Sequence, residues 1–308
     1  MLVIYSMANI ILIIICFFTG ILLQRVKSFP KDAYKAFNFI IINLSLPALA
    51  LLYIPQIKVD SQIIFPIASM WIVFAFAIIV FIVLGKIFQW DKATVGALIM
   101  TAGLCNSSFV GFPVLMTMFG EEGLKVGVVI DQAGSFVVLA TAGVIVSSVF
   151  ASQEFKVSKI IRDILIYPPF IAFVIGIILK FFGFQHSESS KSILERLGGL
   201  IVILALISVG LQLKITIKEI PFKEMFYGLL YKLLLAPALI YLLYFIVAKG
   251  RGLSVDVSLI ESAMPPMVMG SVMAVSYNLN PKLANLMVGI GIPLSFLTLA
   301  LWYFVFIV

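Results

Sequence analysis

The stretch CNSSFVGFP, residues 105–113, lies inside a long apolar segment and decides the fold. It places Asn106, Ser107 and Ser108 close to Gly111 and Pro113, two residue types that interrupt helices. Each backbone N–H or C=O group freed in lipid costs on the order of several kcal/mol, so a break persists only where protein or a polar cavity satisfies those groups. The stretch therefore predicts a broken membrane helix beside a cavity.

The composition places the rest of the chain in a membrane. Hydrophobic residues make up 63% of the 308 residues and charged residues 11%, with a mean hydropathy of +1.20. These values lie far outside those of a soluble globular domain. Apolar segments recur throughout, with connections too short for a second domain, so we expect one transmembrane domain over 1–308 in contact with membrane lipid. The net charge of +7 does not indicate nucleic-acid binding, because Lys and Arg are scattered through the connections.

The length of the apolar segments predicts ten transmembrane helices, since a bilayer core of about 30 Å requires about 20 residues per helix. The odd-numbered connections carry most of the Lys and Arg residues, which predicts that both termini are extracytoplasmic. We therefore expect a multi-pass protein of the cell (inner) membrane. The predicted spans are 3–23, 36–53, 63–84, 93–118, 123–150, 161–182, 197–213, 225–248, 255–277 and 283–307.

The two halves of the chain can be aligned at a nearly constant offset. Gly20-Ile-Leu-Leu-Gln aligns with Gly176-Ile-Ile-Leu-Lys, and Gly111 aligns with Gly270. The offset indicates an internal repeat of five helices. Because five is an odd number, the two repeats must enter the membrane from opposite sides, which predicts inverted repeats.

The same alignment places residues 106–107 on the Pro-Pro pair at 265–266, so the breaks in spans four and nine correspond. The repeats are then about 1–150 and 161–308. Paired breaks near the middle of the membrane mark the substrate site of many transporters, because half-helix ends carry partial charge. The alternative is that the glycine and prolines only kink packed helices, as they commonly do in membrane spans.

The quoted stretch also resembles a known family. Asn106-Ser-Ser-Phe-Val-Gly-Phe-Pro113 is similar to the N-x-x-F-x-G-x-P signature of the auxin efflux carrier family, which includes plant PIN transporters and bacterial malate or malonate permeases. Leu44-Ser-Leu-Pro47 and the Pro-containing ninth span also resemble that family. The connection 151–160 is far too short for the long cytosolic loop of plant members, so hormone transport is not expected.

The resemblance implies an all-α fold like that of bile-acid symporters, with helices 4 and 9 broken and crossing. It implies a scaffold of spans 1, 2, 6 and 7, which often dimerises in related folds, and a moving transport part of spans 3–5 and 8–10. It further implies elevator-type transport of a small carboxylate anion. The expected substrate-binding residues at the two breaks are Asn106, Ser107, Ser108, Pro113, Pro265 and Pro266.

Three ionisable residues inside the spans are candidates for coupling transport to a proton or sodium ion. Asp131 lies in span five, with Ser135 one turn later on the same helical face. Glu261 lies one turn before Pro265. Lys232 in span eight could pair with one of these carboxylates, meet an anionic substrate, or extend its amine to the membrane interface. For Asp131 the alternative is a structural hydrogen bond.

No motif for enzymatic chemistry is present. The sequence has no His/Cys cluster with metal-ligand spacing, no G-x-S-x-G elbow and no phosphate-binding loop, so neither an enzyme nor a metal or organic cofactor is expected. Cys16 and Cys105 lie in apolar segments, where they are most simply small hydrophobic residues. A channel or a ligand receptor built on the same fold is the alternative function.

Overall fold

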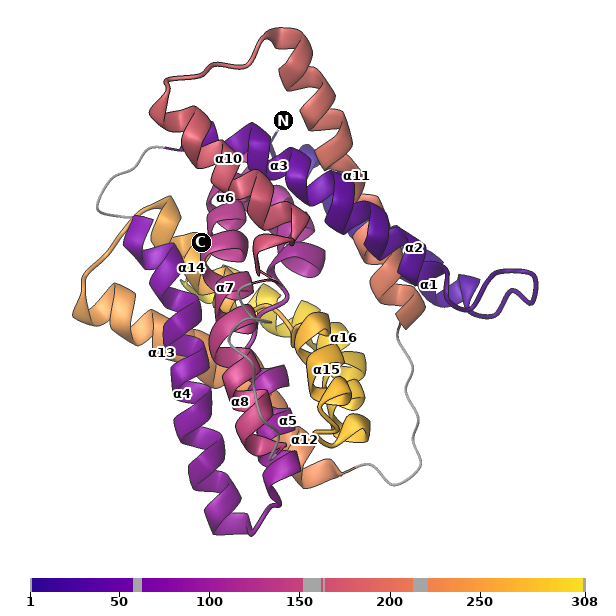
Figure 1. Cartoon of the computed structure of the whole chain (residues 1–308), viewed down its shortest axis with the longest axis vertical. Coiled ribbons are helices and arrows are strands. Elements are labelled where there is room, and N and C mark those ends of the chain that lie inside the picture. Colours follow the sequence, from indigo (N-terminus) through magenta and orange to yellow (C-terminus); the bar gives the residue numbers. More distant parts are fainter. Residues whose placement is uncertain (1, 58–62, 152–161, 163, 213–220, 307–308) are drawn as a thin grey trace. The chain divides into compact units, whose positions relative to one another are not determined.

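The computed structural model describes residues 2–57, 63–151, 162, 164–212 and 221–306, except the side chains of 2–10 and 305–306. Every regular element in this part of the chain is a helix, which confirms the all-α class (Figure 1). Four sequence predictions lie outside the described residues: the connection 151–160 apart from Ala151, the start of span six at 161, the end of span seven at 213 and the end of span ten at 307.

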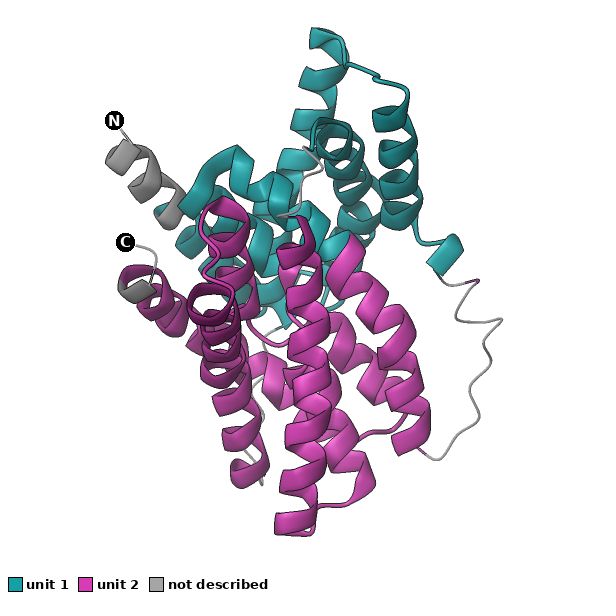
Figure 2. Cartoon of the chain, turned by 90° about the vertical axis from the view of Figure 1, so that its left-hand side faces the viewer, with its two compact units in different colours: residues 1–60, 108–132, 164–213 teal, residues 61–107, 133–163, 214–308 magenta. Residues whose placement is uncertain are grey.

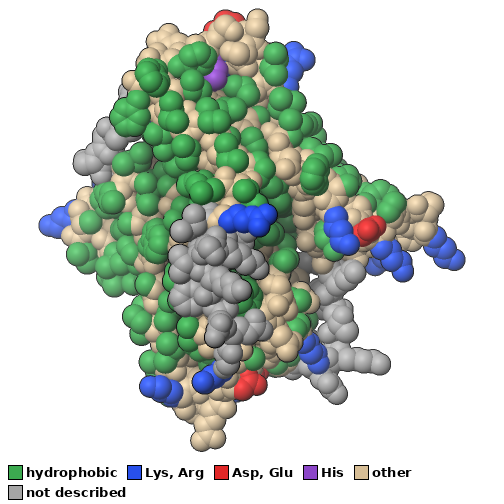
Figure 3. Space-filling model, in the orientation of Figure 1, with side chains coloured by type: hydrophobic (Ala, Val, Ile, Leu, Met, Phe, Trp, Pro, Cys, Tyr) green, Lys and Arg blue, Asp and Glu red, His purple; other side chains and the backbone are tan. Residues whose placement is uncertain are grey.

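Among the described residues, six helical segments are long and apolar enough to cross a membrane. Figure 3 shows hydrophobic side chains over much of the visible surface. Many large hydrophobic side chains of the described residues are exposed, among them Ile79, Ile175 and Leu297. A surface of this kind suits contact with lipid. These observations confirm a polytopic membrane protein. The six segments are Ala33–Gln56, Ile64–Phe88, Ser107–Phe150, Glu188–Gln212, Phe222–Val247 and Pro281–Phe304, and shorter apolar helices are Ile11–Leu23, Lys92–Ala102 and Pro168–Phe181.

The longest of these segments, Ser107–Phe150, is interrupted at Gly120. Gly120 has φ 65° and ψ −155°, which lies outside helical geometry and in a region that favours glycine. One helix therefore ends and another begins at this residue. The connection between the predicted spans four and five, residues 119–122, falls at the same place.

The chain divides into two compact units, coloured separately in Figure 2. Unit 1 comprises residues 1–60, 108–132 and 164–213, and unit 2 comprises 61–107, 133–163 and 214–308. The helices of unit 1 are α1 (Leu2–Leu23), α2 (Ala33–Ile40), η1 (Ile41–Ser45), α3 (Leu46–Tyr53), η2 (Ile54–Gln56), α6 (Phe112–Val129), α10 (Pro168–Phe181) and α11 (Glu188–Gln212).

Unit 1 is held together by close helix packing and by polar contacts between helices. A Cβ atom added to Gly20 on α1 would lie 2.3 Å from the Ile207 oxygen, and one on Gly210 of α11 would lie 2.9 Å from the Gly20 Cα. Only glycine permits this approach, because any side chain would displace the neighbouring backbone. The Ser208 hydroxyl donates to Asn38 Oδ1 at 2.5 Å and joins α11 to α2.

Unit 2 contains the long helix α4 and the two short helices that end at the predicted breaks. Its helices are α4 (Ile64–Phe88), α5 (Lys92–Ala102), α7 (Phe136–Val138), η6 (Leu139–Gly143), α8 (Val144–Phe150), α12 (Phe222–Leu230), η7 (Tyr231–Leu235), α13 (Ala236–Tyr241), η8 (Leu242–Val247), α14 (Leu253–Ser262), α15 (Val268–Ser276) and α16 (Pro281–Phe306). The chain passes from one unit to the other within η4 (Ser107–Gly111) and η5 (Ile130–Ser135).

Asp91 fixes the start of α5, where its carboxylate accepts a hydrogen bond from the Thr94 backbone at 2.6 Å. This is a standard N-cap and satisfies one of the free N–H groups of the first turn. The side-chain amide of Asn280, which lies just before α16, donates a hydrogen bond to the Thr94 hydroxyl at 2.9 Å. The position of α5, and of the break at its other end, is thus set relative to α16.

The segment that carries Lys232 is held on both sides by hydrogen bonds to neighbouring helices. Pro237 has no backbone N–H, so it cannot bond to the Leu233 carbonyl one turn earlier. The Trp302 indole N–H on α16 donates to that carbonyl at 3.0 Å. On the other side, the Tyr231 hydroxyl donates to the Val73 carbonyl of α4 at 2.5 Å. Both anchoring residues belong to the π-helical turn η7, so these hydrogen bonds fix the turn in place.

Candidate functional site

The first break lies between α5, which ends at Ala102, and η4, which begins at Ser107. Helical structure thus stops earlier than the Gly and Pro residues of the quoted stretch would suggest. Pro113 occupies the first turn of α6, directly after η4, and is buried. Wider π-helical turns such as η4 let the backbone adjust around a proline without ending the helix. The interruption therefore covers 103–106, and Pro113 lies beyond it.

The second break separates α14, which ends at Ser262, from α15, which begins at Val268. Pro265 and Pro266 lie between the two helices. Proline has no N–H for the helix ladder and disfavours helical geometry in the residue before it. The Pro-Pro pair therefore explains why the helix stops here, as the sequence predicted.

The two breaks meet within unit 2, where α5, α14 and α15 are labelled in Figure 1. The Asn106 N–H donates to the Pro265 carbonyl at 3.0 Å, and the Met267 N–H donates to the Leu104 carbonyl at 3.3 Å. Each break thus satisfies backbone groups that the other has freed. This exchange is what a helix interruption inside a membrane requires.

Small residues allow the two breaks to approach this closely. Cys105 and Pro266 face each other as an isolated antiparallel bridge. A Cβ atom on Gly291 of α16 would lie 2.7 Å from Pro266 Cδ, and one on Gly270 of α15 would lie 2.4 Å from the Met100 oxygen of α5. Larger residues at either glycine would push the helices apart.

The polar side chains at the first break differ in whether they have hydrogen-bond partners. Asn106 is 2% exposed, and its Nδ2 has no hydrogen-bond partner among the described residues. The Ser107 hydroxyl lies 2.7 Å from the Ser135 hydroxyl, both buried in unit 2. Asn106 therefore retains a buried donor that a ligand could use, whereas Ser107 is already hydrogen-bonded.

Asp131 and Ser108 form a separate polar group within unit 1. Asp131 is 3% exposed and accepts hydrogen bonds from the Ser108 hydroxyl and, at 2.7 Å, from the Gln132 amide. Ser135, expected on the same helical face, instead bonds with Ser107 in unit 2. The structure thus shows the hydrogen bonds of Asp131, and its coupling role stays a prediction.

Lys232 is fully buried in unit 2, at the point where the breaks meet. Its ammonium donates to the Cys105 sulfur at 2.8 Å and to the Ser262 carbonyl at 3.0 Å. Extension of the amine to the membrane interface, one of the alternatives from the sequence, is therefore wrong. Glu261 is also fully buried, in the last turn of α14, and both Glu261 and Lys232 lie within electrostatic range of Cys105.

Cys105 and Ser262 are site residues that the sequence did not indicate. Cys105 was interpreted as a small hydrophobic residue, although its 1% exposure is accompanied by contact with an ammonium group. Ser262 contributes its backbone carbonyl, which no side-chain pattern reveals. The position of Cys105 next to Asn106 in the quoted stretch was the only available signal.

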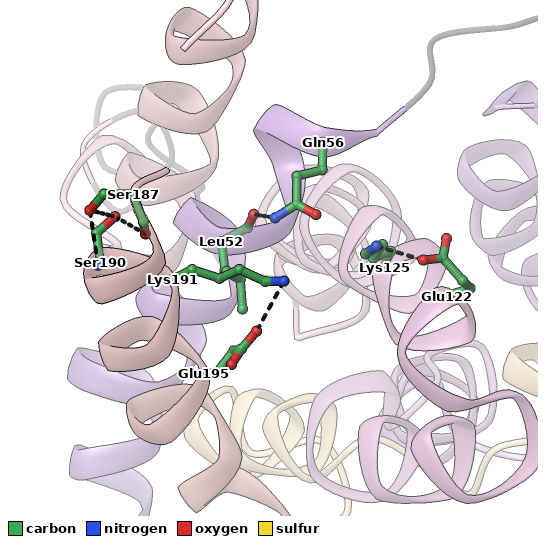
Figure 4. A network of polar contacts seen from close by, with 8 residues as sticks. All are labelled: Leu52, Gln56, Glu122, Lys125, Ser187, Ser190, Lys191 and Glu195. Atoms are coloured by element: carbon green, nitrogen blue, oxygen red, sulfur yellow. Dashed lines mark hydrogen bonds and ion pairs between the residues drawn. The ribbon is translucent and has the colours of Figure 1, made fainter. Parts of the chain in front are cut away.

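A second set of polar residues lies in unit 1 and is drawn in Figure 4. Lys125 pairs with Glu122 at 2.6 Å, and Lys191 lies 3.7 Å from Glu195. Both pairs join residues three or four positions apart on one helix, and three of the four side chains are at least two-fifths exposed. Pairs of this kind contribute little to stability. We interpret them as stabilising helix surfaces and not as a site.

Comparisons with known proteins agree with a transport function. The profile of the family described as "Membrane transport protein" matches residues 2–303. The uncharacterized transporter MJ1031 of Methanocaldococcus jannaschii is 30% identical over 95% of this chain and 96% of its own length. An uncharacterized transporter of Methanothermobacter thermautotrophicus is 25% identical over 96% of this chain and 97% of its own length. The chain therefore belongs to the membrane transport protein family, which is the auxin efflux carrier family that its motif resembles.

Proposed function

We propose that this protein is a secondary active transporter that moves a small organic carboxylate anion by elevator-type alternating access, coupled to a proton or a sodium ion. The observation that carries the proposal is the meeting of the two breaks in unit 2. There the Asn106 N–H bonds to the Pro265 carbonyl. Paired breaks of this kind form substrate sites in transporters whose folds are built from repeats.

The substrate would bind at the two breaks. Asn106 offers a buried amide donor, and an amide side chain can both donate to a carboxylate and accept from a cation. In this proposal Glu261 takes up the coupling ion, and its burial one turn before Pro265 supports this role. Asp131, hydrogen-bonded to Ser108 in unit 1, is the second coupling candidate. No further cofactor is part of the proposal.

The proposed architecture has ten transmembrane helices in two inverted repeats, with both termini on the extracytoplasmic side of the inner membrane. The interruption at Gly120 supports it, because it divides the 44-residue run Ser107–Phe150 into two helices. In this proposal spans 1, 2, 6 and 7 form a scaffold through which a homodimer assembles, and spans 3–5 and 8–10 form the transport part. Residues 108–132 group with unit 1 by their contacts, so their motion is the feature to test.

The first experiment measures thermal stability of the purified protein with mono- and dicarboxylates. A ligand at about 100 times its dissociation constant should stabilise the fold by roughly 2.7 kcal/mol. Asn106→Ala should lose the stabilisation, whereas Asn285→Ala, an exposed amide on α16, should retain it. A shift that survives in Asn106→Ala would show that the site lies elsewhere.

Flux measurements then separate a carrier from a channel or a receptor on the same fold. A carrier in proteoliposomes should exchange labelled substrate against unlabelled substrate, with saturation and trans-stimulation. Uptake without counterflow would indicate a channel, and binding without flux would indicate a receptor. Membership of a transporter family favours the carrier and argues against an enzyme.

A further inference from the structure

The last residue of α3, Tyr53, bonds through its hydroxyl group to a different helix of unit 1. Tyr53 is 4% exposed, and its hydroxyl donates a hydrogen bond to the carboxylate of Glu121, directly after the interruption at Gly120. The Lys125 ammonium lies 5.8 Å from the centre of the Tyr53 ring, within the range of a cation–π attraction. One buried tyrosine thus contacts two charged residues that lie one turn apart on α6.

The bond between Tyr53 and Glu121 differs from the ion pairs drawn in Figure 4, because it joins two helices. Lys125 and Glu122 pair across three positions of α6. Tyr53 and Glu121 instead belong to α3 and α6. The carboxylate of Glu195 on α11 also lies within electrostatic range of the Tyr53 hydroxyl. Polar groups from three helices of unit 1 therefore converge on this hydroxyl.

The end of α3 is held in place by donors from α10 and from the connection that follows it. Pro55 has no backbone N–H to donate to the Leu51 carbonyl one turn earlier. The His186 Nε2 lies 3.0 Å from that oxygen, and it must carry the proton because a carbonyl only accepts. The Lys180 ammonium donates to the Ile57 carbonyl just after η2. The side of the contact that α3 contributes is therefore fixed.

The other side of the contact belongs to residues 119–122, which we call the hairpin tip. Gly120 in this tip has φ 65° and ψ −155°, and no atom of the described residues lies within 4 Å of a Cβ atom added there. Glu121 and Glu122 are exposed. Because glycine adopts many backbone conformations, the chain can change direction at Gly120 at little steric cost. Such a change would break the bond to Tyr53.

The proposed topology places all parts of this contact on one side of the membrane. Tyr53 ends the predicted second span, Glu121 lies in the connection between the fourth and fifth spans, and Glu195 lies just before the seventh. These are even-numbered connections, which share the extracytoplasmic side in that topology. Spans two and seven belong to the proposed scaffold, whereas spans four and five belong to the proposed transport part. The contact would therefore join a moving part to a fixed one.

We propose that the Tyr53 hydroxyl and the Glu121 carboxylate form a latch, which holds the hairpin tip against α3 and opens in each transport cycle. This inference rests on the proposed elevator mechanism and adds to it a contact that limits its rate. Lys125 supports the latch through the same ring. While the latch is closed, residues 108–132 remain grouped with unit 1, as their contacts indicate.

Hydrogen exchange of the purified full-length protein tests whether the latch holds the tip. Tyr53→Phe and Glu121→Ala should each speed exchange of the backbone amides of residues 119–125 by about 3- to 10-fold, the factor that corresponds to the loss of one hydrogen bond. The double variant should exchange little faster than either single variant, because both remove the same bond. Equal exchange in wild type and in both single variants would overturn the latch.

The matched control is Glu122→Ala, which removes the neighbouring carboxylate. The Glu122 side chain is 69% exposed, and its ion pair is with Lys125 on the same helix. Exchange of the tip should stay within about twofold of wild type, because exposed pairs of this kind contribute little and the bond to Tyr53 remains. Glu121→Ala keeps the test decisive if Tyr53→Phe fails to fold, since truncation of the exposed Glu121 leaves no cavity in the core.

Counterflow in proteoliposomes tests whether the latch opens during transport. Radiolabelled acetate, malonate and malate are the probes. Tyr53→Phe and Glu121→Ala should raise the initial rate of counterflow severalfold, because residues 108–132 then move over a lower barrier. Glu122→Ala should leave the rate unchanged. Faster hydrogen exchange without any change in the rate of counterflow would overturn the role of the latch in transport.

The two measurements separate this inference from the proposed function. If none of the three anions exchanges in wild type, the proposed function fails, and hydrogen exchange still decides whether Tyr53 and Glu121 hold the tip. If the anions exchange but the variants show unchanged hydrogen exchange, the latch is overturned while the transporter proposal stands.

Discussion

The two helix breaks of unit 2 reach the same result by different chemistry. The break between α5 and η4 contains Asn106 and is directly followed by Ser107, and both polar side chains are buried. The break between α14 and α15 contains Pro265 and Pro266, which stop the helix through the backbone. The two breaks nevertheless satisfy each other in the same way, because one backbone hydrogen bond runs in each direction: the Asn106 N–H donates to the Pro265 carbonyl and the Met267 N–H to the Leu104 carbonyl.

The largest expected effect concerns Glu261, an acidic residue next to the second break that has no counterpart next to the first break. Helix α14 carries buried Glu261, whereas the sequence of α5, KATVGALIMTA, contains no acidic residue. Glu261→Gln should abolish uptake driven by a pH or sodium gradient, since the amide cannot take up the coupling ion. Counterflow of labelled substrate should persist, because it needs no net coupling.

Asp256→Asn is the control for this prediction. Asp256 lies on the same helix but is partly exposed, so gradient-driven uptake should continue. Accumulation that remains normal in Glu261→Gln would assign coupling to another group, with Asp131→Asn as the next variant to test.

The first break, which contains Asn106, should bind the carboxylate substrate. Asn106→Ala should weaken carboxylate binding by about 100-fold, or about 2.7 kcal/mol, since a charge-assisted hydrogen bond to the substrate is lost. The free energy of unfolding should change by less than about 1 kcal/mol, because Nδ2 has no hydrogen-bond partner among the described residues and the backbone bond to Pro265 remains. Titration calorimetry and thermal melts measure the two quantities. A large loss of stability with unchanged affinity would assign Asn106 a structural role.

The close approach of the two broken helices can be tested at Gly270. A methyl group there would meet the Met100 carbonyl oxygen of α5 at 2.4 Å, so the helices must shift. Gly270→Ala should lower the free energy of unfolding by about 1–3 kcal/mol, the usual range for overpacking. Gly199→Ala is the matched control, because nothing lies within 4 Å of its added methyl group. Equal melting temperatures for the two variants would contradict the packing described.

The smallest effect is expected at Ser107, which directly follows the first break. Ser107→Ala removes the 2.7 Å contact with the Ser135 hydroxyl and should cost about 1 kcal/mol of stability. Ser135→Ala should cost about the same, and the double variant little more, since both remove one interaction. Additive losses in this double-mutant cycle would show that the two hydroxyls do not interact.

Much of the fold could be predicted because it depends on local chemistry. The apolar segments indicated an all-α membrane protein, and the Pro-Pro pair at 265–266 indicated the second break. The first break was located less well, since Pro113 lies inside α6 and the interruption ends before Ser107. Proline is tolerated in the first turn of a helix, so its presence alone does not position an interruption.

The site was less predictable because its contacts join residues distant in sequence. The sequence showed that Lys232 lies in an apolar span, but three environments were compatible with it. Its contact with Cys105 joins residues 127 positions apart, and no local pattern encodes such a pair. Ser135 shares a helical face with Asp131 by its spacing, yet it bonds with Ser107 because that hydroxyl is the one packed against it.

The sequence by itself determined that this protein is a membrane transporter with two interrupted helices, because hydropathy, proline chemistry and family motifs are properties of short segments. Only the tertiary structure decided that the interruptions meet, that Asn106 keeps an unused donor and that Lys232 lies buried beside Cys105. The physical reason is that these features depend on which helices pack together. Packing depends on how well the surfaces of helices from distant parts of the chain fit one another.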